Sequence, residues 1–228
     1  MTKEEGGAPV TKNEGRVRVV VATRNAGKLR ELVPLLEEAA LGFELVTIDA
    51  LAPTAELRED GLTFEENALA KARQAAAATG LPALADDSGL EVDALGGAPG
   101  VYSARYAGVG ATDAANNAKL LEALRHVPPA RRTARYRCVA AFVDPARGRE
   151  LTRAGSCEGT LLEAPRGAGG FGYDPLFVVA EAPSAASVAS VVARGLTMAE
   201  IPLDEKNRLS HRAAAFRALA AALAAAGV

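Results

Sequence analysis

The chain has 228 residues, of which 24% are charged, and a formal net charge of -2, so its length suits one large domain with a sizeable core. This charge balance argues against a bulk nucleic-acid or membrane-surface binder, and it means that an anionic ligand must be held by local groups. Two histidines are too few for a histidine-built zinc site, and Cys138 and Cys157 match no metal spacing, which predicts small core residues in a reduced, cytoplasmic setting.

Residues 1–15 are polar and contain glycine, so we expect a disordered tail there and a single domain over residues 16–228. No apolar run reaches the length of a membrane span, which predicts no membrane partner. Residues 16–22 are short and β-branched, which is typical of a buried strand. Leucines then recur at helical spacing over residues 29–40, where Pro34 is expected to kink or restart the helix because it removes a backbone hydrogen bond.

The polar loop between this strand and this helix, residues 23–28, contains Gly27 and Lys28. A strand, such a loop and a helix can cradle phosphate, because backbone N–H groups and the helix dipole face the anion while the lysine adds charge. The loop is not a Walker loop, since Ala22 stands where the first glycine belongs and Leu29 replaces the required Ser or Thr. An ordinary connector between a strand and a helix is the alternative interpretation.

Residues 43–48 predict a second strand, and the polar loop over residues 52–60 carries three acidic residues. Thr63 and Glu66 form a capping box, which predicts the start of an Ala-rich helix. Gly80 predicts the end of that helix, because glycine readily takes the left-handed conformation of a C-terminal cap.

An apolar run over residues 81–85 leads directly into the adjacent carboxylates Asp86 and Asp87. We expect a buried strand to end here and to deliver these side chains to a cleft. Neighbouring carboxylates at a strand end diverge to opposite faces, so one can hold a metal ion or a water while the other bonds backbone. The alternative is an Asx-turn, in which Asp87 and Ser88 only satisfy loop amides.

Thr112 predicts the N-cap of a third helix, whose buried leucine stripe ends at Leu124. Residues 136–143 and 150–158 flank a turn-forming segment, which predicts a hairpin.

Residues 165–175 are dense in glycine and contain Phe171. This pattern predicts backbone that approaches a flat ligand closely, with the ring left free to stack on it. In the alternative, Phe171 tucks into the core. A short strand is expected over residues 176–179, and a loop or short helix over residues 183–195.

The last predicted helix begins at Ser210, with His211 and Arg212 in its first turn, where the helix dipole disfavours cations. A bound anion would remove that conflict, whereas a solvated face would tolerate it. Strands and helices alternate in the first half of the chain and a hairpin follows, which predicts a mixed α/β sheet with helices on its faces.

Six short motifs occur in a fixed order along the chain. They are Thr23-x-Asn25-x-x-Lys28, Thr63-Phe64-Glu65-Glu66-Asn67-Ala68, Ala85-Asp86-Asp87-Ser88-Gly89-Leu90, Gly97-Ala98-Pro99-Gly100-Val101-Tyr102-Ser103-Ala104-Arg105-Tyr106, Gly170-Phe171-Gly172-Tyr173-Asp174-Pro175 and Ser210-His211-Arg212. Together they resemble the non-canonical purine nucleoside triphosphate pyrophosphatases, also called inosine/xanthosine triphosphate pyrophosphatases. Six motifs in one order are far more specific than any one of them.

The resemblance implies an α/β fold with two lobes, a long mixed β-sheet flanked by helices and a central substrate cleft, usually in a homodimer. It also implies Mg²⁺-dependent cleavage of ITP, dITP or XTP to the monophosphate and pyrophosphate, which clears deaminated purines from the nucleotide pool. The implied partner is a small nucleotide, with neither nucleic acid nor a membrane involved.

By this resemblance, Asp87 is the essential carboxylate, both proton acceptor and metal ligand, and Glu59 is a second metal contact. Residues 23–28 correspond to the phosphate-side loop, and residues 171–174 to the base-binding loop. The chain departs from the family pattern in its extra N-terminal residues and in the longer, more apolar segment 180–197. The implied substrate contacts are Thr23, Arg24, Asn25, Ala26, Gly27, Lys28, Ser88, Phe171, Gly172, Tyr173, Asp174, Lys206, His211 and Arg212.

Three competing functions can be weighed against this one. A pyrophosphatase for pyrimidine or modified nucleotides is disfavoured by the glycine-aromatic loop and the Ser-His-Arg motif. A nucleotide-binding regulator without turnover is disfavoured by the presence of both Asp87 and Lys28. A phosphatase that forms an aspartyl-phosphate is disfavoured because the usual Asp-x-Asp spacing is absent.

Overall fold

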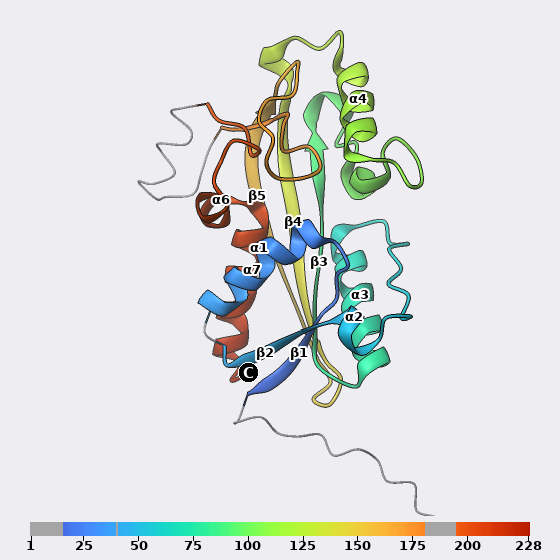
Figure 1. Ribbon diagram of the computed structural model, residues 1–228, viewed down its shortest axis with the longest axis vertical. Helices are drawn as coiled ribbons and strands as arrows, with labels where there is room; N and C mark the ends of the chain where they lie inside the picture. Colours follow the sequence, from blue (N-terminus) through green and yellow to red (C-terminus); the bar gives the residue numbers. More distant parts are fainter. Residues whose placement is uncertain (1–15, 40, 181–194) are drawn as a thin grey trace, which may run out of the picture.

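A single mixed sheet of six strands organises the computed structural model, which describes residues 16–39, 41–180 and 195–228 (Figure 1). The strand order is β2-β1-β3-β4-β5-β6. β1 pairs in parallel with β2 and β3, whereas the pairs from β3 to β6 are antiparallel, so the predicted mixed α/β sheet is confirmed. The strands are β1 (Val17–Val21), β2 (Phe43–Thr47), β3 (Ala83–Val92), β4 (Thr133–Asp144), β5 (Arg149–Leu161) and β6 (Phe177–Val179).

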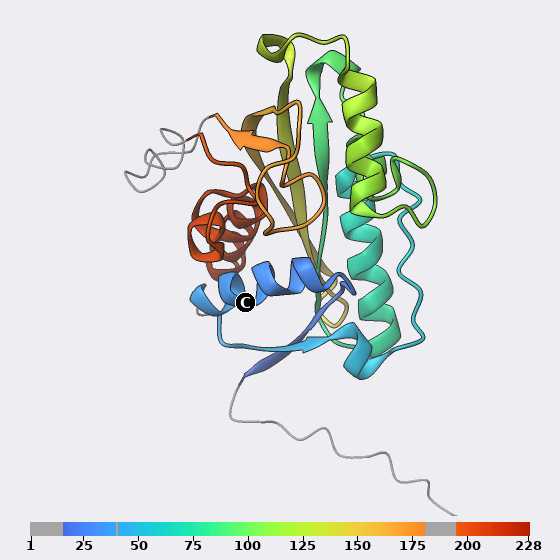
Figure 2. The ribbon, with the colours of Figure 1, turned by 45° about the horizontal axis from the view of Figure 1, so that its top comes forward.

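Helices cover both faces of this sheet. Figures 1 and 2 show α1 and α7 on one face, α3 on the opposite face, and α4 beside the far end of the long strands. The helices are α1 (Ala26–Glu38), α2 (Ile48–Leu51), α3 (Phe64–Thr79), α4 (Asp113–Leu124), α6 (Leu203–Leu209) and α7 (His211–Ala225). None of the helices described is long and apolar enough to cross a membrane.

The hydrophobic core consists of three clusters of buried residues. Two of them form one lobe and the third forms the other. At one end of the sheet, one cluster lies under α1 and α7, and a second lies under the alanines of α3. The third cluster gathers the other end of β3–β5 with α4, β6 and Leu209 of α6. Cys138 and Cys157 are both buried, which confirms their predicted role as small core residues.

Helix α1 begins earlier than its leucine pattern predicted. The Asn25 side chain accepts a hydrogen bond from the Lys28 N–H (3.0 Å) and acts as the N-cap, so the helix starts at Ala26 rather than at Leu29. Pro34 neither ends nor restarts the helix, contrary to one predicted outcome. It lies on the exposed side, where solvent can satisfy the carbonyl that loses its partner.

The prediction that a strand ends at Asp86 and Asp87 is wrong. β3 continues to Val92 and pairs with β4 along its whole length, with Asp86 opposite Ala140 and Asp87 opposite Val139. The Asx-turn alternative is therefore wrong as well. The expected divergence of the two carboxylates to opposite faces holds, because side chains alternate along any strand.

The other predicted elements are present with shifted ends. The capping box of α3, its left-handed cap at Gly80 and the β4–β5 hairpin are confirmed, although both hairpin strands are longer than expected. Helix α6 was not predicted. The tail over residues 1–15 and nearly all of the loop or short helix expected over residues 183–195 lie outside the described residues.

Candidate active site

A cleft of about 410 Å³ lies beside the middle of β3, where the N-terminal ends of α1 and α7 meet the glycine-rich loop before β6. Small-molecule sites typically enclose about 300–1,000 Å³. Two predicted site residues, Ala26 and Gly27, do not line the cleft; they lie in the first turn of α1. The predicted residues that do line it are Thr23, Arg24, Asn25, Lys28, Glu59, Asp87, Ser88, Phe171, Gly172, Tyr173, Asp174, Lys206, His211 and Arg212.

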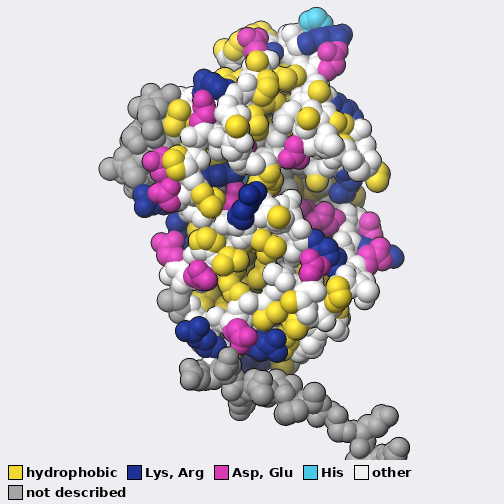
Figure 3. Space-filling view, viewed as in Figure 1, with side chains coloured by type: hydrophobic (Ala, Val, Ile, Leu, Met, Phe, Trp, Pro, Cys, Tyr) yellow, Lys and Arg dark blue, Asp and Glu magenta, His cyan; other side chains and the backbone are white. Residues whose placement is uncertain are grey.

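Charges of both signs are interspersed on the face of the molecule that Figure 3 shows. Cations inside the cleft are therefore the groups that can attract an anion there. Lys28 is one of them, with its Nζ 3.0 Å from an Asp86 carboxylate oxygen. Arg24 is engaged elsewhere: its guanidinium donates to Asp49 and to backbone carbonyls of the loop after α2, so it fixes the loop that carries Glu59.

Asp87 faces α3 and is held by side chains of that helix. Its carboxylate accepts a hydrogen bond from Asn67 Nδ2 (2.9 Å), and Lys71 Nζ lies 3.8 Å from its other oxygen. Burial raises the pKa of Asp87, although the Lys71 cation opposes this. A carboxylate of raised pKa in a cleft is suited to accept a proton.

Lys71 was missed by sequence reasoning. It is buried and pairs with Glu59 as well as lying close to Asp87. The signal that could have found it is its position: Asn67 and Lys71, one helical turn apart, interrupt the alanine stripe that α3 buries.

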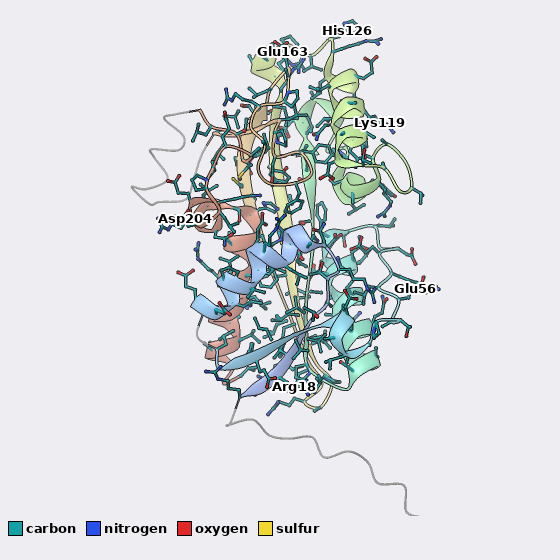
Figure 4. All side chains as sticks on the ribbon, in the orientation of Figure 1. Arg18, Glu56, Lys119, His126, Glu163 and Asp204 are labelled. Carbon is teal, nitrogen blue, oxygen red and sulfur yellow. The ribbon has the colours of Figure 1, made fainter. Side chains whose placement is uncertain are left out.

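Asp87 and Glu59 are the predicted metal ligands, and the carboxylates of both lie near Lys71 Nζ. Among the residues described there is no group of three His, Cys, Asp or Glu side chains that could hold one. Two carboxylates sharing the cation of Lys71 nevertheless fit Mg²⁺, which is commonly bound by one or two carboxylates together with substrate phosphates. Glu56, on the same loop, points away from the molecule in Figure 4 and pairs with Arg58 instead.

Asp86 faces the opposite side of the sheet and joins a buried ionic cluster. Arg212 donates to Asp86 (3.2 Å), to Ser88 Oγ (2.8 Å) and to the Glu31 carboxylate. Burial favours the neutral acid, yet the Lys28 and Arg212 cations hold the pKa of Asp86 well below its usual range. The cation at the start of α7 is thus neutralised by buried carboxylates of the protein, and neither a bound anion nor a solvated face is needed to explain it.

Glu31 was also missed by sequence reasoning. Its carboxylate pairs with Lys206 (2.6 Å) as well as with Arg212, and all three side chains are buried. The available signal was its place on the buried side of α1, next to Leu32 and one turn before Leu35.

His211 is buried at the start of α7. Its ring stacks on Tyr136, with the ring centroids 4.7 Å apart, and Tyr136 in turn donates to Asp174 (3.1 Å). Burial, together with the Arg212 and Lys206 cations, holds the pKa of His211 well below its usual range. Within the described parts of the chain, His211 lines the cleft and its buried Nδ1 has no hydrogen-bond partner.

The Phe171 ring lies in the cleft wall and outside the three hydrophobic clusters. The alternative interpretation, in which Phe171 tucks into the core, is therefore wrong. The ring is half-buried and lies near the Lys206 and Arg212 cations, at 5.1 and 5.7 Å. It approaches the first turn of α1 so closely that a Cβ on Gly27 would be 2.7 Å from Phe171 Cδ1. Gly27 therefore serves the predicted site by making room for this ring.

Comparison with known proteins identifies the family. A family model described as the Ham1 family matches residues 19–222. The chain belongs to the Ham1 family. This agrees with the resemblance that the six motifs carry.

Named relatives and solved structures match most of the chain. Proteins named dITP/XTP pyrophosphatase from Geobacter sulfurreducens (54% identical, covering 89% of this chain and 94% of that protein) and Thermus thermophilus (53%, 89% and 90%) are examples. The Ham1 protein structures from Staphylococcus aureus (TM-score 0.75, 36% identical) and Coxiella burnetii (TM-score 0.77, 41% identical) each cover 91% of this chain, which covers 98% of theirs. The two-lobed fold predicted from the resemblance is thereby confirmed.

Proposed function

We propose that this protein hydrolyses the deaminated purine triphosphates dITP, ITP and XTP to the monophosphate and pyrophosphate. The observation that carries the proposal is that one cleft joins a phosphate-side cation, a buried carboxylate and a glycine-aromatic loop suited to a purine. The names of the relatives support it, since they are dITP/XTP pyrophosphatases at 50% identity or more over most of the chain. The biological role that follows is removal of deaminated purines from the nucleotide pool.

Cleavage between the α- and β-phosphates requires an oriented water and neutralisation of the polyanion. Asp87 is the group that accepts the proton of the attacking water, because it is a buried carboxylate of raised pKa in the cleft. Lys28 and Lys71 supply positive charge on either side of it, one from α1 and one from α3. Ser88, next along β3, lines the same wall.

Mg²⁺ is the proposed cofactor, with Asp87 and Glu59 as the residues that would hold it together with the substrate phosphates. When bound, the ion supplies positive charge that stabilises the phosphates as negative charge develops on them. The other partners we propose are those expected from the sequence: a second copy of this chain in a homodimer, and no nucleic acid, for a single-domain enzyme of the cytoplasm.

The 6-oxo group distinguishes these substrates from ATP, and His211 is the residue that we propose recognises it. Arg212 already donates to three protein groups, whereas the pKa of His211 is lowered and, among the described residues, its buried Nδ1 has no hydrogen-bond partner. With its proton on Nδ1 this ring donates to a 6-oxo group and leaves a 6-amino group unpaired. Such a mismatch at a buried polar group can reject a substrate by orders of magnitude.

The deciding experiment measures pyrophosphate release from a panel of purine and pyrimidine triphosphates, with Mg²⁺ and with EDTA. We expect dITP, ITP and XTP to be cleaved rapidly and ATP, GTP and the pyrimidine nucleotides slowly, with loss of activity in EDTA. Binding without pyrophosphate release would favour a regulator, and preference for pyrimidine nucleotides would favour the other enzyme class.

Replacing Phe171 by Ala is expected to raise KM for all purine triphosphates together, because a ring face carries no 6-oxo information. Base–aromatic stacking is worth about 1–3 kcal/mol, which corresponds to a rise of about 5- to 150-fold. The melting temperature should stay close to that of the unmodified protein, since the ring lies outside the hydrophobic clusters. A large fall in melting temperature with unchanged KM would show that Phe171 serves the fold instead.

Replacing Lys28 by Ala should mainly raise KM, and the effect should shrink as added salt screens the triphosphate. The fold should tolerate the change because Asp86 keeps Arg212 as a partner. Lys119→Ala, on the outer side of α4, is the matched loss of a lysine away from the cleft. An unchanged KM for Lys28→Ala at low salt would limit Lys28 to a structural role.

A further inference from the structure

Helix α4 is hydrogen-bonded to the glycine-rich loop through both the N–H and the carbonyl of Gly172. The Gly172 N–H donates to Asp113 Oδ2 (2.7 Å), and its carbonyl accepts from Asn117 Nδ2 (2.8 Å). Asp113 and Asn117 lie one turn apart, on the same side of the helix. Gly172 has a φ of 62°, so it presents both groups from a left-handed conformation that few other residues adopt.

These two hydrogen bonds hold one side of the turn that carries Phe171. On its other side, Asp174 accepts from the Phe171 N–H (2.9 Å) and pairs with Lys206 of α6 (2.7 Å). The turn is thus suspended between α4 and α6, with the Phe171 ring between the two attachments. Movement of Gly172 would necessarily move the ring that precedes it.

Capping of α4 does not account for these two side chains. The N-cap of α4 is Thr112, whose hydroxyl accepts from Ala115 N–H, so Asp113 is not needed for capping. Within the described residues, Asn117 Oδ1 is buried without a hydrogen-bond partner, an arrangement that an apolar residue would avoid. What both side chains share is Gly172.

We propose that Asp113 and Asn117 are positioning residues that set the place of the Phe171 ring for the purine. The inference rests on the proposed function in one respect, that Phe171 contacts the base. They act through the backbone of Gly172. The N-terminal part of α4, which the six family motifs do not include, thereby takes part in binding the purine.

The test compares Asp113→Ala, Asn117→Leu and Asp113→Asn with Glu122→Ala, a control that removes a surface carboxylate from the same helix. Hydrogen exchange of the segment 170–174 should become faster in the first two variants and stay unchanged in the control. KM for dITP should rise about tenfold in each, the factor equivalent to one net hydrogen bond, with kcat and melting temperature nearly unchanged. Asp113→Asn keeps an oxygen that can accept from Gly172 and should restore most of the affinity.

A double-mutant cycle with Phe171→Ala separates positioning from direct contact with the nucleotide. If the two side chains act through the ring, Asp113→Ala should add little to the loss that Phe171→Ala already causes. An equal loss in both backgrounds, or unchanged exchange in segment 170–174, would overturn the proposal. Failure of the proposed function would appear differently, because the unmodified protein would then show no turnover. In that case the dissociation constant for dITP would be measured in place of KM. An unchanged dissociation constant in Asp113→Ala would also overturn the proposal.

Discussion

Asp87→Asn is expected to lose at least ~10²-fold in turnover while the protein folds normally. An amide cannot accept the proton of the attacking water and is a poor ligand for Mg²⁺. The fold should persist because Lys71 keeps Glu59 as its partner, and because the change removes a charge that burial already disfavours. Pyrophosphate release under saturating dITP, measured beside the circular dichroism of the same sample, tests both halves of the expectation.

Asp93→Asn is the matched control for this variant. Asp93 directly follows β3 and pairs with the surface residue Arg135, away from the cleft. It should therefore retain full turnover. Activity of Asp87→Asn close to that of this control would refute the assignment of Asp87 as the proton acceptor.

Arg212→Ala is expected to lower the free energy of unfolding by ~3–5 kcal/mol, because it removes the cation from a buried ionic cluster. Among the cations that the structure describes in ion pairs with them, Glu31 would keep Lys206 and Asp86 would keep Lys28, inside a site from which water is largely excluded. Urea unfolding with an unchanged m value would measure the loss. Arg217→Ala is the control: this arginine lies on the exposed side of the same helix, so its loss should cost much less than the loss of Arg212.

Because Arg212→Ala is expected to destabilise the protein, a change in its substrate preference would not by itself show that Arg212 contacts the purine base. A narrowed ratio of ITP to ATP turnover would be expected if Arg212 read the base directly. Because its guanidinium is already bound by protein groups, any such change would arise through displaced neighbours. Equal stability of the Arg212 and Arg217 variants would contradict this account and return the guanidinium to a direct contact with the substrate.

The parts of the fold that follow from local chemistry could be predicted from the sequence. The capping box at Thr63 and the cap at Gly80 define α3 without reference to any other segment. β3 could not be delimited in this way, because Asp-Asp-Ser-Gly has the composition of a turn. Its continuation to Val92 depends on pairing with β4, some fifty residues later in the chain.

The same distinction applies to the candidate site. Residues within short motifs, such as Asp87 and Phe171, could be identified because the motif itself carries the pattern. Glu31, Lys71 and Asp113 could not, since each acquires its significance from a partner far away in sequence: Arg212, Asp87 and Gly172. In the sequence of its own segment, each of these three residues is simply a polar residue in a helix.

The alternation of Asp86 and Asp87 across β3 ties the activity of the enzyme to correct strand pairing. A slip of one residue in the pairing of β3 with β4 would exchange the faces of the two carboxylates. Asp87 would then meet the cations of α1 and α7, and Asp86 would meet α3. A misregistered molecule would therefore be inactive even if it remained compact, so recovery of activity after refolding reports on the register of β3 more directly than recovery of secondary structure does.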